Sequence, residues 1–249
     1  MTPVFIDIET LPAVEWSDEQ KKAYGMKNHP KRMSKPETIQ AWYDKEGKDL
    51  WQRTALDPML GHILCVAVKV AGQEARCIKG SRLHRAVPPW LEGTAAGYSW
   101  VERVLLVELH AFLQPLLEPP YESHSDHVVV AHNGYGFDFP WLIKRACILG
   151  VPELGALLMP RKRWGTHLLD TQDAWMRLLP GGRGYVSKDA LCDAFGIPND
   201  DEITGADVYR CWKDGELELI EHHAKRDVEK LEAIWDRMDA CNMFERYRR

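Results

Sequence analysis

Two acidic side chains near the start of the chain have a spacing that could hold a metal ion. Residues 4–10 read VFIDIET, a run whose apolar members favour β-structure, so we predict a buried central strand. Side chains alternate between the two faces of a strand, so Asp7 and Glu9 share one face while Ile6 and Ile8 share the other. Both carboxylates should therefore point into the same space.

A pair of acids on one face of an apolar strand is unfavourable on its own, because each charge loses hydration and repels the other. A divalent cation offsets both effects, and hard oxygen ligands at this spacing suit Mg²⁺ or Mn²⁺. The ordinary alternative is an edge strand on which both acids point into water. For an isolated Asp-x-Glu pair this alternative is the commoner one, so the remaining sequence has to decide.

Two more acids occur in segments that are predicted to form helices. Asp138 stands at the start of a helix, after the polar turn that ends a β-branched strand at 127–133. Asp227 lies in a later helix, within the string HHAKRD. Taken singly, Asp138 could be a helix N-terminal charge and Asp227 an exposed helical acid. Only the order and the sequence context of all four acids together indicate a functional site.

The strings VFIDIET, HNGYGFD and HHAKRD, in this order, resemble the three exonuclease motifs of the DEDD family of 3′–5′ exonucleases. The second motif is usually Asn-x-x-x-Phe/Tyr-Asp, and the run from Asn133 to Asp138 fits it. The strings SKDALCDAFGIP and GELELIEHHAKRDVE extend the resemblance to the predicted exonucleases related to the proofreading domain of family B polymerases. The resemblance implies a ribonuclease-H-like α/β fold, with a mixed central sheet of about five strands flanked by helices.

The implied activity is metal-dependent removal of nucleoside 5′-monophosphates from a 3′ end. Phosphodiester hydrolysis needs an activated water and a stabilised leaving oxygen, and two divalent ions about 4 Å apart supply both. Four carboxylates, Asp7, Glu9, Asp138 and Asp227, are predicted to hold two Mg²⁺ or Mn²⁺ ions. Asp7 is the better candidate to bridge both ions.

The general base that takes the proton of the water is predicted to be a histidine. The family divides by whether the base is a His five residues before the last Asp or a Tyr four residues before it, and this chain has His222 and His223 at those two spacings. In a continuous helix His223 shares a face with Asp227, whereas His222 reaches inward only if the helix begins at His223. The family spacing favours His222 slightly, and both histidines remain candidates.

The resemblance also implies residues that bind the substrate. Thr10 and Leu11 are expected to line the pocket of the 3′ nucleotide. Asn133 and Phe137 could contact the terminal nucleotide, although a structural turn and a core aromatic are equally good interpretations. Asp170 follows a short strand, where it could cap the next helix or contribute to the metal site.

The 249 residues are predicted to form a single exonuclease domain in which residues 12–60 are a helical insertion. The insertion contains helix-start patterns at 17–20 and 35–37, and its tryptophans distinguish it from a flexible linker. Alternating strand and helix patterns predict an α/β fold, with a hairpin that makes the sheet mixed. The predicted strands lie at 61–70, 75–78, 127–133 and 168–171, and the predicted helices at 100–117, from 137, from 187 and at 205–238 with a break at Gly215.

Composition excludes several classes of protein. A net charge of −5 argues against a basic protein that coats nucleic acid. Basic residues do gather at 21–35, 161–163 and 246–249, but such clusters are more often solvated surface than phosphate contacts. The six cysteines are scattered without a Cys-x-x-Cys pair, which disfavours a zinc site and predicts a reducing, cytoplasmic setting. No signal peptide and no membrane-spanning run are predicted.

The expected partner is a nucleic acid with a free 3′ end, with single-stranded DNA favoured, and replication or repair proteins are possible further partners. Two alternatives stay open. One is an RNA-directed 3′–5′ exoribonuclease or oligoribonuclease, because a few pocket contacts decide 2′-hydroxyl discrimination. The other is a non-catalytic nucleic-acid-binding module of the same fold, which the presence of all four acids disfavours.

Overall fold

A five-stranded mixed sheet forms the centre of the protein in a computed structural model that describes residues 1–79, 93–118, 126–160, 167–178 and 184–245. The strand order is β3-β2-β1-β4-β5, with β4 and β5 parallel to β1 and with β2 and β3 forming an antiparallel hairpin beside it. The predicted fold class is therefore confirmed, with β1 at the centre. The strands are β1 (Thr2–Leu11), β2 (His62–Val70), β3 (Arg76–Lys79), β4 (His127–Ala131) and β5 (Leu168–Asp170).

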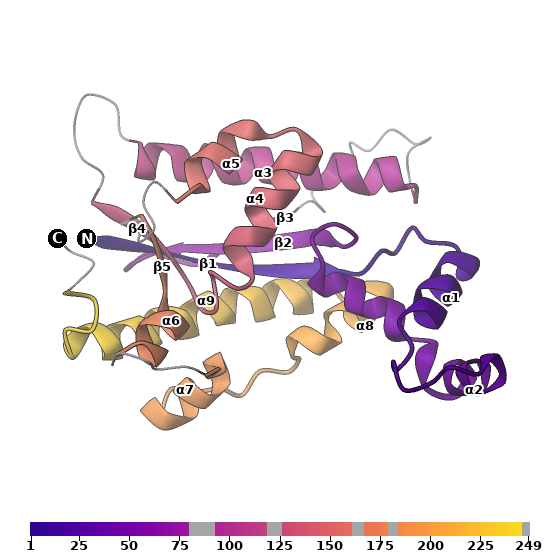
Figure 1. Cartoon of the computed structure of the whole chain (residues 1–249). Coiled ribbons are helices and arrows are strands. Elements are labelled where there is room, and N and C mark those ends of the chain that lie inside the picture. Colours follow the sequence, from indigo (N-terminus) through magenta and orange to yellow (C-terminus); the bar gives the residue numbers. More distant parts are fainter. Residues whose placement is uncertain (80–92, 119–125, 161–166, 179–183, 246–249) are drawn as a thin grey trace.

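Helices cover both faces of the sheet (Figure 1). One layer contains α3 (Ala95–Leu117), α4 (Asp138–Leu149) and α5 (Pro152–Leu158). The other face is covered by the long helix α9 (Leu217–Ala240). The shorter helices α6 (Thr171–Met176), α7 (Lys188–Phe195) and α8 (Val208–Lys213) lie around it. Each layer has its own hydrophobic core against the sheet.

The two faces of β1 belong to different cores. Ile6 and Ile8 pack into the core under α3, α4 and α5, whereas Phe5 packs into the core under α9. Because side chains alternate along the strand, Asp7 and Glu9 lie on the α9 face. Pairing with β2 shifts register between Glu9 and Thr10, and such a bulge re-aims the side chains beside it. The predicted shared face of the two acids is confirmed.

The segment after β1 is helical, as predicted. Its elements are α1 (Asp18–Lys27), α2 (Pro36–Trp42), the π-helical turn η1 (Tyr43–Gly47) and the 3₁₀ helix η2 (Leu50–Leu56). Ser17 caps α1 in a capping box with Gln20, which is the helix start that the sequence indicates. The hydroxyl of Thr10 donates to the carbonyl of Ala55 at 2.7 Å, which ties η2 to the end of β1. That the whole chain is a single domain stays a prediction.

Some elements differ from the sequence-based expectation. Helix α3 begins at Ala95 with Thr94 as its N-cap, so it is longer than the helix predicted at 100–117. Helix α5 was not anticipated, because its seven residues are too few to show a clear period. The basic runs at 161–163 and 246–249 lie outside the described residues. Of the helices within the described ranges, none has the length and apolarity needed to cross a bilayer.

A buried ionic network joins the insertion and β2 to the layer that contains α3 and α4. Glu102 on α3 accepts two hydrogen bonds from Arg145 on α4, at 2.7 and 2.6 Å. His62 lies 3.3 Å from Glu102 and 2.9 Å from Glu15, which precedes α1. Burial alone would lower the pKa of His62, but hydrogen bonds to Glu102 and Glu15 reverse this effect and raise the pKa to about 9. The imidazole is therefore a cation in the folded protein at neutral pH.

His62 should make stability fall at alkaline pH. Its pKa is about 9 in the folded state against 6.5 ordinarily, so its contribution is complete below pH 6.5 and disappears as pH rises through 9. The shift corresponds to about 3 kcal/mol in the free energy of unfolding. Urea denaturation of the wild type and of His62→Gln at pH 6, 7.5 and 9.5 measures this. The advantage of the wild type should shrink with increasing pH, and parallel pH profiles for the two proteins would contradict the network.

Candidate active site

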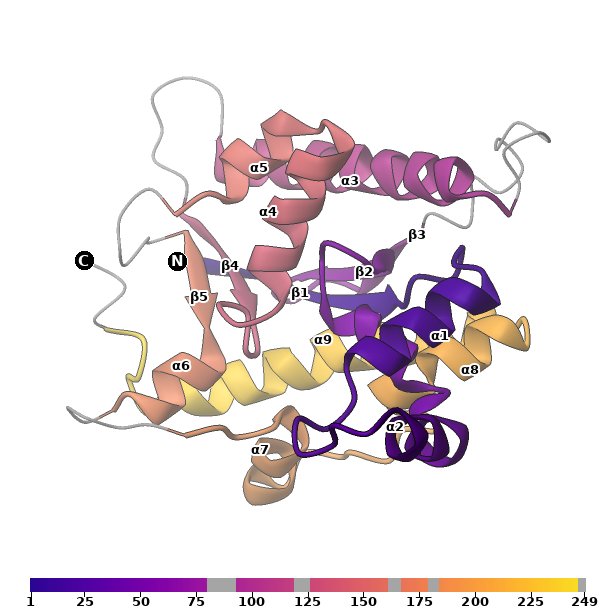
Figure 2. The same ribbon diagram turned by 45° about the vertical axis from the view of Figure 1, so that its right-hand side comes forward.

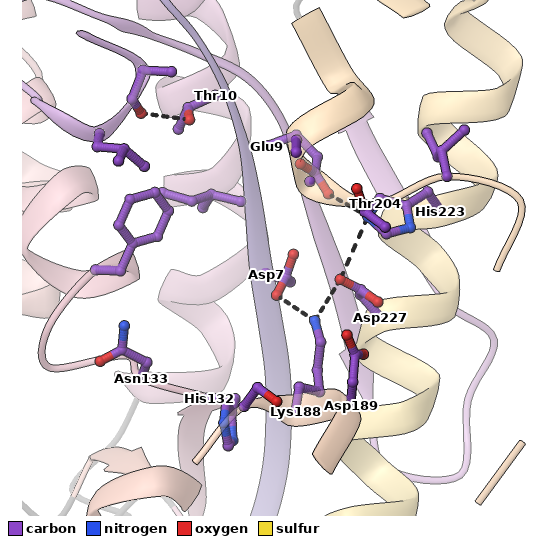
Figure 3. Close-up of a pocket in the computed structure, with 18 of the residues that line it drawn as sticks. Asp7, Glu9, Thr10, His132, Asn133, Lys188, Asp189, Thr204, His223 and Asp227 are labelled. Carbon is purple, nitrogen blue, oxygen red and sulfur yellow. Dashed lines mark hydrogen bonds and ion pairs between the residues drawn. The ribbon is translucent and has the colours of Figure 1, made fainter. Parts of the chain in front are cut away.

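The acids singled out by the sequence line one cleft of about 840 Å³. The walls come from distant parts of the chain: β1, the loop after β4, the 3₁₀ helix η2, the N-terminus of α7, the loop before η5 (Gly205–Asp207) and α9. Figure 3 shows the carboxylates of Asp7 and Asp227 pointing toward each other across it. The sequence-predicted residues that line the cleft are Asp7, Glu9, Thr10, Asn133, Phe137, Asp138, His223 and Asp227.

The two acids on β1 are held in a poorly solvated position. Glu9 is only 6% exposed, and burial together with the nearby charge of Asp7 raises its pKa well above the ordinary value. Burial also raises the pKa of Asp7. Both carboxylates therefore ionise less readily than exposed acids.

Asp138 reaches the same cleft from the start of α4. The pairing of β1 with β4 ends at Phe5, so the backbone N–H of Ile8 has no strand partner on that side. It donates instead to Oδ1 of Asp138 at 3.2 Å. Asp138 is 3% exposed, and burial followed by the charge of Asp7 raises its pKa well above the ordinary value. The end of the β1–β4 ladder thus fixes the third acid beside the first two.

The loop between β4 and α4 is organised by Asp170. Its carboxylate caps α6 through the N–H groups of Gln172 and Asp173, and it also accepts from the N–H groups of Asn133 and Tyr135, both at 3.0 Å. This confirms the helix-cap interpretation of Asp170, which does not line the cleft. Asp170 therefore positions the loop that carries the second motif.

The spacing within the second motif follows from this tight loop. Asn133 adopts a left-handed conformation with φ of 59°, which Asn tolerates better than most residues. The N–H groups of Gly136 and Phe137 both donate to the carbonyl of Asn133, at 3.0 and 2.9 Å. A Cβ atom on Gly136 would meet Oδ1 of Asn133 at 2.4 Å, so a larger residue there would require the Asn133 side chain to move. The loop is thereby closed just before Asp138.

One face of α9 supplies the remaining groups. His223, Asp227 and Lys230 are spaced by four and three residues, so they project from the same side of the helix toward the cleft. His222 lies on the outer side and is exposed. The slight preference for His222 required a helix that begins at His223, but α9 begins at Leu217. The structure corrects that expectation and places His223 at the acids.

The ring of His223 lies among three carboxylates. Nε2 is 3.6 Å from Oε1 of Glu9 and 3.8 Å from Oδ2 of Asp227. On the opposite side of the ring, Nδ1 is 3.5 Å from Oδ2 of Asp201, which also pairs with Lys230. Asp201 is thus the carboxylate next to Nδ1, and Nε2 is the ring nitrogen that faces Glu9 and Asp227.

Lys188 lies between the acids and neutralises part of their charge. Its ammonium is 3.0 Å from Oδ1 of Asp7 and 2.5 Å from Oδ2 of Asp227, as Figure 3 shows. Burial alone would lower the pKa of Lys188, but both carboxylates raise it above its ordinary value, so the side chain stays charged. Lys188 in this way occupies the space where the acids of β1 and α9 converge.

Asp227 differs electrostatically from the other three acids. Burial would raise its pKa, but the charges of Lys188, His223 and Lys230 outweigh this effect and lower the pKa below the ordinary value. Asp227 is therefore the acid that most readily keeps its negative charge. The cleft contains one firmly ionised carboxylate and three that burial and mutual repulsion push toward protonation.

The arrangement can hold a metal ion. Within the described residues, ligand atoms of Glu9, His223 and Asp227 lie within 4.8 Å of one another. The carboxylates of Glu9 and Asp138 in the same cleft have pKa values well above the ordinary range, because burial disfavours their charged form. Buried acids that ionise with difficulty fit a site that a hard divalent cation completes.

The substrate-pocket expectations divide between cleft and core. Thr10, Asn133 and Phe137 line the cleft as predicted. Leu11 does not, because it is 3% exposed and packs with Phe5 in the core under α9. Leu11 lies two residues after Glu9, so alternation puts it on the α9 face, where it packs into the core instead of lining the cleft. Leu11 is therefore corrected to a core residue.

Sequence reasoning missed Lys188, Asp201 and Lys230. One signal for Lys188 existed: it stands at the first position of α7, directly after the Ser187 cap, where the helix dipole disfavours a positive charge. A lysine placed there needs another reason, and the reason is the pair of acids opposite. Lys230 was visible as the next residue on the His223–Asp227 face, whereas Asp201 lies in a loop with no comparable signal.

Comparison with known proteins gives a family match and a structural match. A family model described as a predicted 3′–5′ exonuclease related to the exonuclease domain of PolB matches residues 112–243, more than half of the chain, and confirms the resemblance drawn from the motifs. The matched segment includes Asp138, His223 and Asp227 but not β1. A search of curated proteins returned no match.

Among solved structures, the family B DNA polymerase from the hyperthermophilic archaeon Pyrobaculum calidifontis is similar, with a TM-score of 0.55 and 16% sequence identity. The similarity covers 96% of this chain and 24% of the polymerase chain, so this chain spans about a quarter of the polymerase's length. At this identity the match supports the fold, which agrees with the observed mixed sheet.

Removing the Lys188 charge should destabilise the metal-free protein. Lys188→Met leaves Asp7 and Asp227 facing each other without their shared cation, and loss of one partner from a buried ion pair costs about 3–5 kcal/mol. Chemical denaturation with a chelator present measures this cost. Lys144→Met, at an exposed position on α4, is the control and should lie close to the wild type. Equal stability of the two variants would contradict the role of Lys188.

Proposed function

Because the chain belongs to the family of predicted 3′–5′ exonucleases related to the exonuclease domain of PolB, we propose that it removes nucleoside 5′-monophosphates from the 3′ end of single-stranded DNA. The observation that supports this most directly is the convergence of Asp7, Glu9, Asp138 and Asp227 on one cleft. A binding module has no need to gather four carboxylates that repel one another. A phosphodiester hydrolase does, because its metal ions require them.

The four acids would hold two Mg²⁺ or Mn²⁺ ions, and Asp7 is the ligand proposed to be shared between them. When bound, these ions would supply Lewis acidity to the attacking water and to the leaving 3′ oxygen. The chain's own contribution is to present oxygen ligands from three elements at fixed positions. Lys188 is paired with Asp7 and Asp227 and balances part of their negative charge.

We propose His223 as the general base that takes the proton of the attacking water on Nε2. Its ring is buried beside Glu9 and Asp227, and Nε2 faces the same cleft as the acids. Asp201 would hold the other ring nitrogen and so fix the tautomer and the ring plane, as carboxylates do for other catalytic histidines. His222 is exposed and does not line the cleft, so we propose His223 instead.

The cleft suits an unpaired strand end. Two exposed apolar side chains, Leu56 on η2 and Tyr185 before α7, stand on its rim, where unstacked bases can pack against them. Thr10, Asn133 and Phe137 lie deeper, near the acids. An RNA 3′ end is the second candidate, because no contact in the cleft identifies a group that would reject or require a 2′-hydroxyl.

The activity should appear as metal-dependent shortening from the 3′ end. A 5′-labelled single-stranded DNA oligonucleotide should give a ladder of shorter labelled products with Mg²⁺ or Mn²⁺ and none with a chelator. Asp7→Asn and Asp227→Asn should each lower turnover by at least about 10³-fold while the protein stays folded, because each removes a metal ligand. Denaturing gel electrophoresis of the products and circular dichroism of the variants measure the two effects.

A matched RNA oligonucleotide, run in parallel, separates the two substrate classes by the ratio of kcat/KM. Glu74→Gln and Glu218→Gln remove exposed acids outside the cleft and serve as charge controls. Wild-type turnover in Asp7→Asn would contradict the metal site. The absence of 3′ shortening of DNA and RNA with both metals would leave the non-catalytic binding module as the better interpretation.

The two adjacent histidines should differ sharply when each is replaced. His223→Ala should lower kcat by about 10²–10⁴-fold, the usual contribution of a general base, whereas His222→Ala should change it less than about twofold. Asp201→Asn should lower kcat by about 10-fold with little change in KM, because it disturbs the histidine and not the substrate. Single-turnover assays on the labelled DNA give these values. Small and equal losses in both histidine variants would exclude a histidine base.

A further inference from the structure

A strongly basic segment stands out against the acidic character of the chain. Residues 21–35 contain six lysines and arginines and no Asp or Glu: Lys21, Lys22, Lys27, Lys31, Arg32 and Lys35. With six positive charges in this segment and −5 overall, the remaining residues carry −11. Such a separation of charge within one chain is a feature that binding of a polyanion uses.

The six cations are not taken up by ion pairs. Among the described residues, no carboxylate lies within 4.0 Å of any of their charged atoms, whereas Lys45 in the same insertion pairs with Glu46. Five of the six are exposed, and Lys21 lies partly buried with its ammonium 4.5 Å from the ring centre of Trp51. The segment thus keeps its positive charges available to a partner while its base is packed against η2.

The arm is joined to the wall of the cleft. We call residues 18–42, with helices α1 and α2, the basic arm. Lys21 on α1 contacts Trp51 of η2, and the next two residues of η2, Gln52 and Arg53, line the cleft. Trp51 also packs edge-on against Tyr209 of α8, which lines the cleft as well. Figure 2 shows α1 and α2 together beyond the end of β1, next to α8.

We propose that the basic arm binds the phosphates of the substrate strand upstream of its 3′ end. The inference rests on the proposed nuclease function and adds where the rest of the strand lies. The cleft cannot provide this attraction, because its lining carries many acids and the proposed metal ions would act only on the terminal phosphate. A strand that continues over η2 reaches exposed lysines and arginines that make no ion pair within the described parts of the chain. The partner class is therefore single-stranded nucleic acid of several nucleotides.

The test compares two variants with equal loss of charge. The arm variant carries Lys27→Gln, Lys31→Gln, Arg32→Gln and Lys35→Gln, four exposed positions. The control variant carries Arg76→Gln, Arg103→Gln, Lys144→Gln and Arg237→Gln, four exposed positions on β3, α3, α4 and α9. All eight side chains are at the surface, so both proteins should fold, which circular dichroism and thermal unfolding check.

Binding of a fluorescein-labelled single-stranded DNA of about 20 nucleotides is measured by anisotropy, with a chelator present and at several salt concentrations. The arm variant should bind about 10-fold more weakly at low salt, and its slope of log K against log salt should be shallower by about 2, as expected for the loss of about three phosphate contacts. The control variant should keep the wild-type slope. Equal slopes in both variants, or the absence of salt-dependent binding in the wild type, would overturn the proposal.

Turnover separates this inference from the nuclease proposal. With Mg²⁺, the arm variant should show a raised KM and an unchanged kcat on the 20-nucleotide strand, and wild-type constants on a strand of about four nucleotides, which is too short to reach the arm. If the wild type binds DNA through the arm but does not shorten it, the proposed nuclease function is contradicted, whereas DNA binding by the basic arm is still supported. If the wild type shortens DNA and the arm variant matches the control on both lengths, only the proposal for the basic arm is contradicted. A different partner, such as an acidic protein, would then have to explain the positive charge of the arm.

Discussion

The mutual repulsion of four buried carboxylates is the constraint on which the rest of the site depends. Asp7, Glu9, Asp138 and Asp227 come from three separate elements, and the fold brings them together in a cleft where water cannot fully solvate them. Leaving such a group of charges uncompensated would cost several kcal/mol per ion. The cations and hydrogen-bond donors around the cleft offset part of this cost.

The negative charges of the four acids are not balanced equally by nearby cations. Cations from α7 and α9 surround Asp227, so its pKa falls, whereas the acids of β1 and α4 keep raised pKa values because burial and their neighbours dominate. A backbone N–H from Ile8 supports Asp138 but carries no full charge. In the metal-free site, the negative charge on the α9 side is therefore balanced by cations, whereas the β1 side lacks positive charge. A divalent cation would relieve this deficiency, which couples metal affinity to the stability of the fold.

Much of this site could be predicted because the relevant rules are local. Period-two alternation places Asp7 and Glu9 on one face, and a helix cap at Ser187 begins α7 where the sequence indicates. The choice between His222 and His223 depended instead on where α9 begins, and helix boundaries are set partly by tertiary packing that a sequence does not show. The burial of Leu11 depended on packing under α9, which the strand pattern alone does not reveal. Contacts such as Lys188 with Asp7 join residues far apart in the chain, and no spacing rule predicts them.

The same electrostatics explain why an acidic protein can act on a polyanion. The acids needed to hold metal ions repel the phosphates of a substrate, and this repulsion extends about a Debye length, roughly 8–10 Å, from the cleft. Positive charge inside the cleft is consumed by the acids themselves: Lys188 and Lys230 are paired with them. Attraction must then come from charges that stand outside the cleft and are joined to it rigidly. The basic arm meets both conditions, because its cations form no ion pair with any described residue and α1 packs on η2. Separating the two signs of charge lets one chain bind metal ions at the strand end and phosphates beyond it.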